Sequence, residues 1–464
     1  MRELTKGSPA KVIMTFALPI IFGNLLQQLY NLADGKIVST YVGTQAFAAV
    51  GATAVIANLI IGFVNGVTQG FGIPISRCFG AGDYKNMRRY VAGSFIMTVA
   101  MTLILTVGAL LGIEGLLHIL DTPADIMEEA LQYIRIIIMG TAFISLYNYS
   151  ANILRAVGES RIPLLCLVVA VILNIFLDIL FVHTFSMGLR GAAHATNIAQ
   201  CIAGVLCMAY LLFRFRELVP KGQEWQMQRR KYQEMTVFGI SLGMMSCFVS
   251  IGTVIFQTAV NRLGTKIVTA HIAARRIEEL TNVPMLCTGM AMTTYASQNL
   301  GAGEYDRIKK GIHQAFVIVL VQGVIFTTFC WIFGHPLIRW ITSSNDTYIL
   351  DTAYRYLTRN TSFYFVLGPL FVLRCSLQGL EHKVIPVASS ILELVLKIVS
   401  TIWIVPVLGY TGVIYTEPII WIFMTLMLIG GYVRALKQIN EAEHIKSARN
   451  AKAENEKINV DNRL

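Results

Sequence analysis

Two carboxyl groups lie within otherwise apolar stretches of the first half of the sequence. Asp34 ends a row of polar residues, and Asp178 follows Asn174 by four positions in the stretch LNIFLDILF. Residues four apart share one face of a helix, so this amide and this carboxyl lie together. An ionised carboxyl in membrane hydrocarbon costs roughly 2.5–3.5 kcal/mol on insertion scales, and such residues usually mark ion or proton sites.

Two chemistries are open to such a pair of acids. A carboxyl group that is kept from water favours its neutral form, and a second carboxyl nearby strengthens that preference, so the pair can hold a proton. With the oxygens of Asn174 and Thr196, the carboxyls also offer the hard oxygen ligands that suit Na⁺. We therefore predict a cation site of Asp34, Asn174, Asp178 and Thr196, with Asp34 and Asp178 as metal ligands if the cation is sodium.

Polar residues recur at helical intervals in four apolar stretches. The stripes are Asn24, Gln27, Asn31 and Asp34; Asn58, Asn65 and Gln69; Asn174 and Asp178; and Thr196, Asn197 and Gln200. Polar groups in lipid must find partners or water, so we expect the stripes to converge inside one bundle. Hydrogen bonding between helices without any binding function would produce the same amide stripes. The candidate substrate contacts are the amides Gln27, Asn31, Asn65 and Gln69 and the aromatic Tyr147.

The composition indicates an all-α integral membrane protein that positions these residues on spanning helices. Of 464 residues, 55% are hydrophobic and only 14% are charged, whereas a soluble domain has roughly 25% charged residues. Apolar stretches near the spanning length of about 20 residues recur throughout the chain. They lie near 12–38, 46–73, 90–112, 126–150, 162–182, 190–213, 234–258, 267–292, 311–333, 350–374, 384–406 and 411–433. We therefore predict twelve transmembrane helices.

The net charge of +11 follows the predicted topology rather than a nucleic-acid surface. Lys and Arg gather on one side of the predicted helices, at Arg2, Lys6, Lys11, Arg77, Lys85, Arg88, Arg89, Arg155, Arg161, Arg307, Lys309, Lys310 and the segment 214–231; the opposite loops hold Arg190, Arg262, Lys266 and Arg339. Positive residues remain cytoplasmic, so both termini should be cytoplasmic. We expect contact with membrane lipid and no nucleic-acid partner.

The second half of the chain repeats the first. GAGDY at Gly80–Tyr84 returns as GAGEY at Gly301–Tyr305, and RAVGESRIP returns as QGLEHKVIP, which ends at Pro386. Ordered matches of this kind indicate an internal repeat, and the step from Gly80 to Gly301 defines its interval. We predict six-helix lobes at 1–213 and 234–436, a cytoplasmic linker at 214–233 and a cytoplasmic tail at 437–464. Two lobes of equal orientation are related by a pseudo-twofold axis along the membrane normal and rock around a central cleft.

The second lobe carries charges that its own helices could neutralise. Arg275 lies four residues before Glu279, and Glu393 lies four before Lys397, which favours ion pairs. No partner is obvious for Glu278 or Glu417. These two acids are therefore candidates for binding a cationic substrate.

Pro19 lies on the same predicted helix as Asp34, about four turns earlier. Proline removes a backbone hydrogen bond and weakens a helix locally. It serves either as a simple kink or as a hinge whose bend depends on the charge of Asp34, and the hinge is the functional hypothesis.

Enzyme chemistry finds no support in the sequence. The histidines are spread over different segments, no cysteines form a CxxC pair, and no phosphate-binding GxxxxGK[ST] motif is present. We predict no enzymatic activity and no cofactor beyond the coupling ion, H⁺ or Na⁺.

The repeated GAG[DE]Y, the early QQLYNLAD and the later GLRGAAHAT resemble motifs of the multidrug and toxic compound extrusion (MATE) family over roughly residues 5–436. The resemblance implies a twelve-helix, two-lobed exporter coupled to a cation. The family's cation site in the first lobe would fall on Asp34, Asn174, Asp178 and Thr196, and its bending proline on Pro19. The implied protein is a bacterial antiporter in the cytoplasmic membrane that exports amphipathic, often cationic drugs or metabolites by alternating access. We expect it to act as a monomer.

Two features qualify the resemblance. Some members carry an acid on the seventh helix, but the corresponding stretch SCFVSIGTVIFQTAV holds only Gln257, which argues against a sodium site of that kind in the second lobe. The alternative function is a lipid-linked saccharide flippase of the same superfamily. Such relatives commonly have two more helices and would need more basic residues to meet pyrophosphate.

Overall fold

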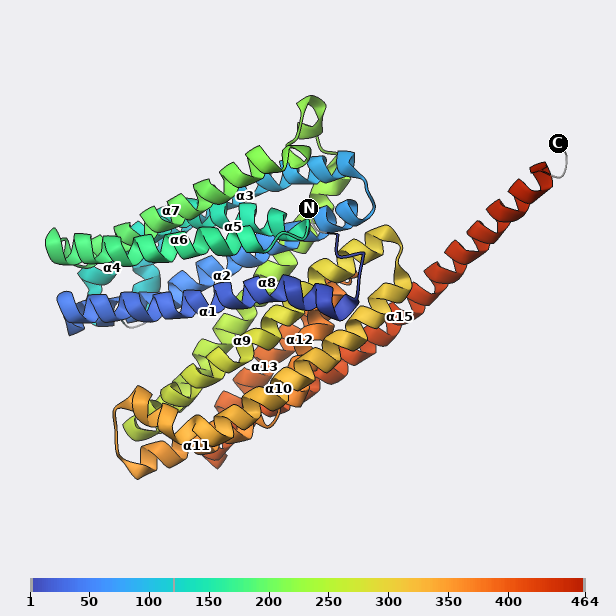
Figure 1. Ribbon diagram of the computed structural model, residues 1–464. Helices are drawn as coiled ribbons and strands as arrows, with labels where there is room; N and C mark the ends of the chain where they lie inside the picture. The colour runs from blue at the N-terminus through green and yellow to red at the C-terminus, as the bar shows by residue number, and fades with distance from the viewer. Residues whose placement is uncertain (1–2, 120–121, 462–464) are drawn as a thin grey trace.

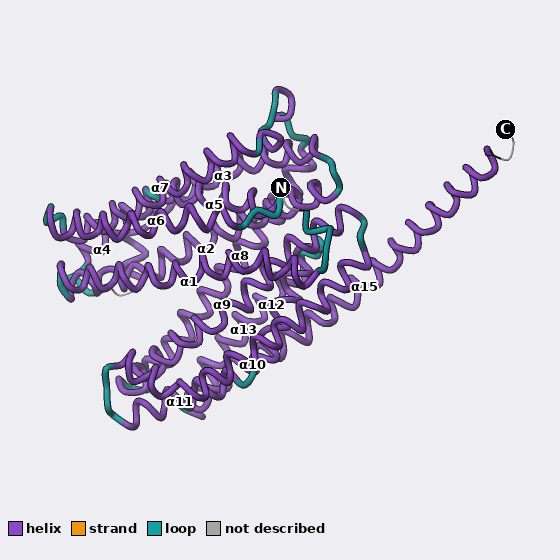
Figure 2. Tube along the Cα trace, in the orientation of Figure 1, coloured by secondary structure: helices purple, strands orange, loops and turns teal. Residues whose placement is uncertain are grey.

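The computed structural model describes residues 3–119 and 122–461, and the described chain is helical throughout, without strands (Figures 1 and 2). Arg2 of the charge argument and residues 462–464 of the predicted tail lie outside the described residues. The predicted all-α fold is confirmed.

The first lobe consists of α1–α7. Its elements are α1 (Pro9–Tyr41), α2 (Thr44–Gly80), α3 (Tyr84–Ile119), α4 (Met127–Met139), α5 (Thr141–Ala156), α6 (Arg161–Asp178), the π-helix η1 (Ile179–Thr184) and α7 (Gly188–Arg214). Proline at the first position of α1 suits a helix start, where its missing N–H has no intrahelical role. Each of α4–α5 and α6–η1 forms one membrane-crossing segment.

The second lobe consists of α8–α15 and repeats this plan. Its elements are α8 (Arg229–Asn261), α9 (Thr265–Ala302), α10 (Tyr305–Thr342), α11 (Thr347–Thr361), α12 (Tyr364–Gly379), α13 (Val384–Val399), the π-helix η4 (Ser400–Ile404), α14 (Val405–Leu408) and α15 (Tyr410–Asp461). Ten helical segments of the described chain are long and apolar enough to cross a membrane. The other two predicted spans are α9, which carries four charged residues in RRIEE, and the pair α11–α12.

The backbone confirms the internal repeat position by position. The π-helices η1 and η4 begin at Ile179 and Ser400, which are separated by the same interval as Gly80 and Gly301. That interval also separates loop glycines with positive φ: Gly43 and Gly264, Gly82 and Gly303, and Gly188 and Gly409. Such φ values are natural for glycine and strained for other residues. The two lobes therefore follow one backbone plan, as predicted.

The lobes touch at one end and diverge toward the other (Figure 1). At the closed end, an added Cβ at Gly80 would lie 1.9 Å from the carbonyl oxygen of Gln298, and one at Gly301 would lie 2.0 Å from that of Arg77. Arg77 and Gln298 are equivalent positions of the repeat, so the two approaches are reciprocal. The repeated GAG[DE]Y motif thus places side-chain-free positions where α2 and α9 cross backbone to backbone.

Ion pairs join the lobes next to this crossing. The Arg77 guanidinium donates to the Glu234 carboxylate at 3.0 Å and also pairs with Glu381. The hydroxyl of Tyr90 donates to the other oxygen of Glu234 at 2.5 Å. The closed end therefore combines backbone packing with charged contacts between the lobes.

The predicted linker and tail both contain helix. Within the predicted linker lie the short helices η2 (Arg216–Leu218) and η3 (Gly222–Trp225), and Glu224 accepts a hydrogen bond from Arg88 at 2.7 Å. Helix α8 begins at Arg229, ahead of the predicted boundary at 234. Helix α15 continues without interruption past 436 and projects from the bundle (Figure 1). The domain boundaries themselves stay predictions.

Candidate functional site

The predicted cation site lies where α1, α6 and α7 pack together. Asp34 lies on α1, Asn174 and Asp178 lie one turn apart at the end of α6, and Thr196 lies on α7. Asn174 and Asp178 are 1% and 0% exposed, so both face the interior of the lobe. Asp178 is the last α-helical residue before the π-helix η1, a backbone form that is frequent at functional sites.

Asp34 and Asp178 lie close enough for their carboxyl groups to interact. Asp34 Oδ1, both carboxyl oxygens of Asp178 and both amide atoms of Asn174 are buried without a hydrogen-bond partner in the described chain. No Lys or Arg of the described residues forms an ion pair with either acid. Buried polar atoms usually find partners, so five unpaired ones in one place demand an explanation.

Two tyrosines complete the surroundings of the acids. The Tyr30 hydroxyl lies 3.1 Å from Thr196 Oγ1, and the charges of both acids act on Tyr30 and on Tyr133 of α4. The sequence analysis did not select Tyr133, because a single tyrosine in an apolar helix carries no motif. Thr196 therefore reaches the site through Tyr30.

The predicted substrate contacts do not all lie together. Gln27, Tyr30, Asn174 and Gln200 line one small cavity inside the first lobe, which confirms that these parts of three polar stripes converge. Asn31 and Asn65 are exposed, and Gln69 lines a different cavity between the lobes.

Tyr147 and Pro19 both lie within helices of the first lobe. Tyr147 is 7% exposed, and its hydroxyl donates to the carbonyl oxygen of Pro163 at 3.2 Å. Pro19 lies inside the uninterrupted helix α1, as the hinge hypothesis requires. The roles of both residues stay predictions.

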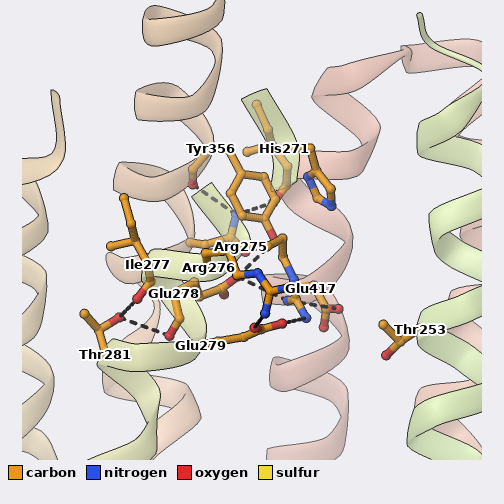
Figure 3. Close-up of polar contacts among 12 residues, drawn as sticks. Thr253, His271, Arg275, Arg276, Ile277, Glu278, Glu279, Thr281, Tyr356 and Glu417 are labelled. Atoms are coloured by element: carbon orange, nitrogen blue, oxygen red, sulfur yellow. Dashed lines mark hydrogen bonds and ion pairs between the residues drawn. The ribbon is translucent and has the colours of Figure 1, made fainter. Parts of the chain in front are cut away.

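A network of ion pairs occupies the second lobe (Figure 3). Arg275 lies among three carboxylates, at 3.2 Å from Glu278, 3.8 Å from Glu279 and 4.0 Å from Glu417. The Tyr356 hydroxyl donates to Glu278 Oε2 at 3.1 Å. The predicted Arg275–Glu279 pair is confirmed, although Arg275 lies closer to Glu278.

The network continues from Glu417 to α13. Lys397 lies 3.3 Å from Glu417 and donates to Glu393 at 3.0 Å, and Arg374 lies 3.6 Å from Glu393. The predicted Glu393–Lys397 pair is confirmed. The expectation that Glu278 and Glu417 lack partners is wrong: Arg275 is one helical turn from Glu278, and α13 and α15 pack so that Lys397 meets Glu417.

The two lobes thus differ in what their acids can do. The acids of the first lobe have no basic partner among the described residues, so they can take up a cation. Those of the second lobe are neutralised within the protein, and Glu278 Oε1 is the one carboxylate oxygen of this network, within the described chain, that is buried without a partner. No cluster of three or more His, Cys, Asp or Glu side chains suited to a metal occurs among the described residues.

Known proteins resemble the chain over most of its length. It is 26% identical to the probable multidrug resistance protein YpnP of Bacillus subtilis over 87% of this chain and 88% of that protein. It is 22% identical to the FAD transporter of Shewanella oneidensis over 83% and 86% of the two chains. A crystal structure of MATE in complex with MaL6 matches with a TM-score of 0.87 and 24% identity, covering 95% of this chain and 99% of that one.

The family comparison follows the internal repeat. The MatE family model matches residues 19–180 and again residues 242–403, once in each lobe. Together these matches cover more than half of the chain and include three of the four predicted cation-site residues, Asp34, Asn174 and Asp178. The chain therefore belongs to the MATE family, whose members are membrane transporters and not enzymes.

Proposed function

We propose that this protein is a cation-coupled antiporter that exports amphipathic, often cationic organic compounds, with H⁺ or Na⁺ bound at Asp34 and Asp178. The observation that carries the proposal is the group of five unpaired polar atoms on Asp34, Asn174 and Asp178. A proton shared by the carboxyls would satisfy one oxygen of each, and Na⁺ would be bound by the carboxyl oxygens and the Asn174 amide oxygen. The coupling ion is the only cofactor that this mechanism requires.

The coupling step follows from the position of Asp34. Binding of one cation lowers the net charge of the acid pair and offsets the repulsion between the two carboxyls, which changes how α1 packs on α6. Pro19 weakens α1 about four turns away and lets the helix bend in response. A ligand shifts such an equilibrium only by binding its two states differently, and the charge of the acid pair provides that difference.

The shape of the molecule supports alternating access. The closed end carries the loops rich in Lys and Arg, which the positive-inside rule assigns to the cytoplasm. The open end would then face outward, with both termini in the cytoplasm of a bacterium and the chain in its cytoplasmic membrane. We further propose that one copy suffices, because each chain contains both lobes and their cleft.

The substrate class rests on the relatives and on the cleft. YpnP is described as a multidrug resistance protein, and Gln27, Asn31, Asn65 and Gln69 would contact substrate in the first lobe and the cleft. The flippase alternative is not favoured, because the two relatives, from Bacillus subtilis and Shewanella oneidensis, are named for drug resistance and for FAD transport. Glu278 and Glu417 are weaker candidates for substrate contact, since Arg275 and Lys397 neutralise them.

Efflux from proteoliposomes tests the proposal. Ethidium export is driven separately by a pH gradient and by a Na⁺ gradient, in the unmodified protein and in Asp34→Asn. We expect one gradient to drive export and the variant to lose at least ten-fold of the driven rate. Asp351→Asn is the matched control, because this acid is 75% exposed. Undiminished export by Asp34→Asn would refute the site, and export driven by neither gradient would refute the coupling.

A further inference from the structure

A small polar cavity lies between the lobes at the closed end of the cleft. It has a volume of about 30 Å³, which is room for one small group. Its polar lining comes mainly from Gln69, Ser76, Asn152 and Arg155 of the first lobe, and its apolar wall includes Phe16 and Met290.

Arg155 is a cation without an anion in this cavity. It lies in the last turn of α5, where it donates to Asn152 Oδ1 at 3.2 Å, and its Nε is buried without a partner. Within the described residues, no carboxylate lies within 4.0 Å of its guanidinium. By contrast, Arg77, Arg275 and Lys397 each contact at least two carboxylates.

Further donors around the cavity are free to bind. The side chains of Gln69 and Thr294 make no hydrogen bond to any described residue. Asn152 and Ser76 are already engaged, by Thr68 at 3.0 Å and by the carbonyl oxygen of Thr294 at 3.3 Å. Arg155, Gln69 and Thr294 therefore present donors to the cavity from both lobes.

The internal repeat shows that these groups are particular to the first lobe. Gln69 corresponds to Met290 at the repeat interval, and the match of RAVGESRIP with QGLEHKVIP pairs Asn152 with Cys375 and Arg155 with Gln378. Both lobes take part in the crossing at Gly80 and Gly301, but the second lobe has uncharged residues at these positions. Arg155 and the neighbouring amide side chains are thus found in the first lobe only, on a backbone plan that both lobes share.

We propose that Arg155, Gln69 and Thr294 form a subsite for an anionic group of the transported compound, a carboxylate or a phosphate. The guanidinium presents several donors in a planar fork that matches either oxyanion in bidentate geometry. Phe16 and Met290 accommodate the adjoining apolar part. The inference rests on the proposed function and adds to its substrates amphiphiles that carry an anionic group, alone or beside a cationic one.

Equilibrium binding to two matched dyes tests the subsite without any ion gradient. Rhodamine B has a free carboxylate, and its ethyl ester lacks that charge. Titration of the purified protein in neutral-lipid nanodiscs, followed by fluorescence anisotropy, should show at least five-fold tighter binding of the acid. Arg155→Gln, which introduces the residue of the second lobe, should weaken binding of the acid at least ten-fold and of the ester less than two-fold.

Three further variants and a change of lipid sharpen the test. Arg155→Lys should regain part of the preference, because lysine keeps the charge but not the planar fork. Arg161→Gln is the matched control, since this exposed arginine lies outside the cavity. Asp34→Asn should abolish driven export yet keep the preference for the acid, so failure of the coupling site and of this subsite are distinguishable.

The lipid composition distinguishes the two sources of anion. If the phosphate of an anionic lipid occupies the subsite, phosphatidylglycerol nanodiscs will weaken binding of the acid, and Arg155→Gln will abolish that effect. If the soluble carboxylate is the sole occupant, the lipid will make no difference. An unmodified protein that shows no preference for the acid overturns the proposal, as does an Arg155→Gln protein that loses both dyes equally.

Discussion

Equivalent positions of the two lobes hold polar groups in opposite electrical surroundings. Thr196 of α7 and Glu417 of α15 lie at the same place in the repeat, one repeat interval apart. Thr196 contacts Tyr30 near two acids that have no basic partner in the described chain, whereas Glu417 contacts Lys397 and Arg275. Asp34 and Asp178 of the first lobe therefore lack a basic partner among the described residues, whereas Glu417 of the second lobe is paired within the protein.

The difference shows that two lobes with the same backbone plan can hold buried acids in different states of pairing. Both lobes need polar residues at mid-membrane depth to hold helices together. An acid without a fixed cation is costly there, so it persists where its charge is used. A buried acid with fixed cations offsets its desolvation cost by pairing, and removal of one partner is then strongly destabilising. Three variants test this contrast, in order of decreasing effect on stability.

Removal of Arg275 should have the largest effect. Arg275→Gln leaves the carboxylate of Glu278, which is 1% exposed, without its ion-pair partner. It also removes the guanidinium near Glu417. Breaking a buried ion pair costs about 3–5 kcal/mol, and the loss should appear in unfolding by sodium dodecyl sulfate. Its neighbour Arg276 has a side chain that is 55% exposed and, among the described residues, pairs only with Glu279. An Arg276→Gln protein that is equally destabilised would show that the network is not what stabilises the lobe.

Neutralisation of Glu417 should have an intermediate effect. Glu417→Gln leaves Lys397, which is 2% exposed, with Glu393 as its remaining carboxylate in the described chain. Removal of one partner of a buried polar group costs about 1–3 kcal/mol. The same unfolding titration measures it, with Glu279→Gln as control because that side chain is 40% exposed. No loss of stability in Glu417→Gln would place this acid outside the network.

Neutralisation of Asp178 should change stability least. Asp178→Asn removes one of two facing carboxyls that have no ion-pair partner among the described residues, so no cation is left unpaired. We expect the free energy of unfolding to stay within about 1 kcal/mol of the unmodified value or to rise. A loss as large as that of Arg275→Gln would mean that Asp178 has a structural partner, and the contrast between the lobes would fail.

Sequence periodicity predicted much of this arrangement, because the spacing of residues along a helix determines which face of the helix they occupy. Residues four apart must share a face, which placed Asn174 beside Asp178 and Glu393 beside Lys397 before any tertiary contact was known. The repeat interval predicted two six-helix lobes on one plan, and the π-helices η1 and η4 of the structure fall at that same interval. These features depend on local helix geometry and on the internal repeat, and both can be recognised in the sequence.

Contacts between helices that are separate in the sequence could not be predicted from residue spacing. Lys397 and Glu417 meet because α13 packs against α15, and no spacing rule links residues on separate helices. Tyr133 comes near the acids for the same kind of reason. Arg275 was assigned to Glu279 by the four-residue rule, although the three-residue neighbour Glu278 lies closer. The unpaired state of Arg155 in the described chain depends on all the helices that surround it.

The reciprocal crossing at Gly80 and Gly301 has a consequence for how such proteins diversify. Backbone atoms make this contact, so it does not depend on which side chains line the cleft a few residues away. In the proposed cycle, mutations at Gln69, Arg155 or Met290 change what is carried while the crossing of α2 and α9 stays intact. In that same proposal, exchange of either glycine for a larger residue forces the two backbones apart and impairs the cycle for every substrate.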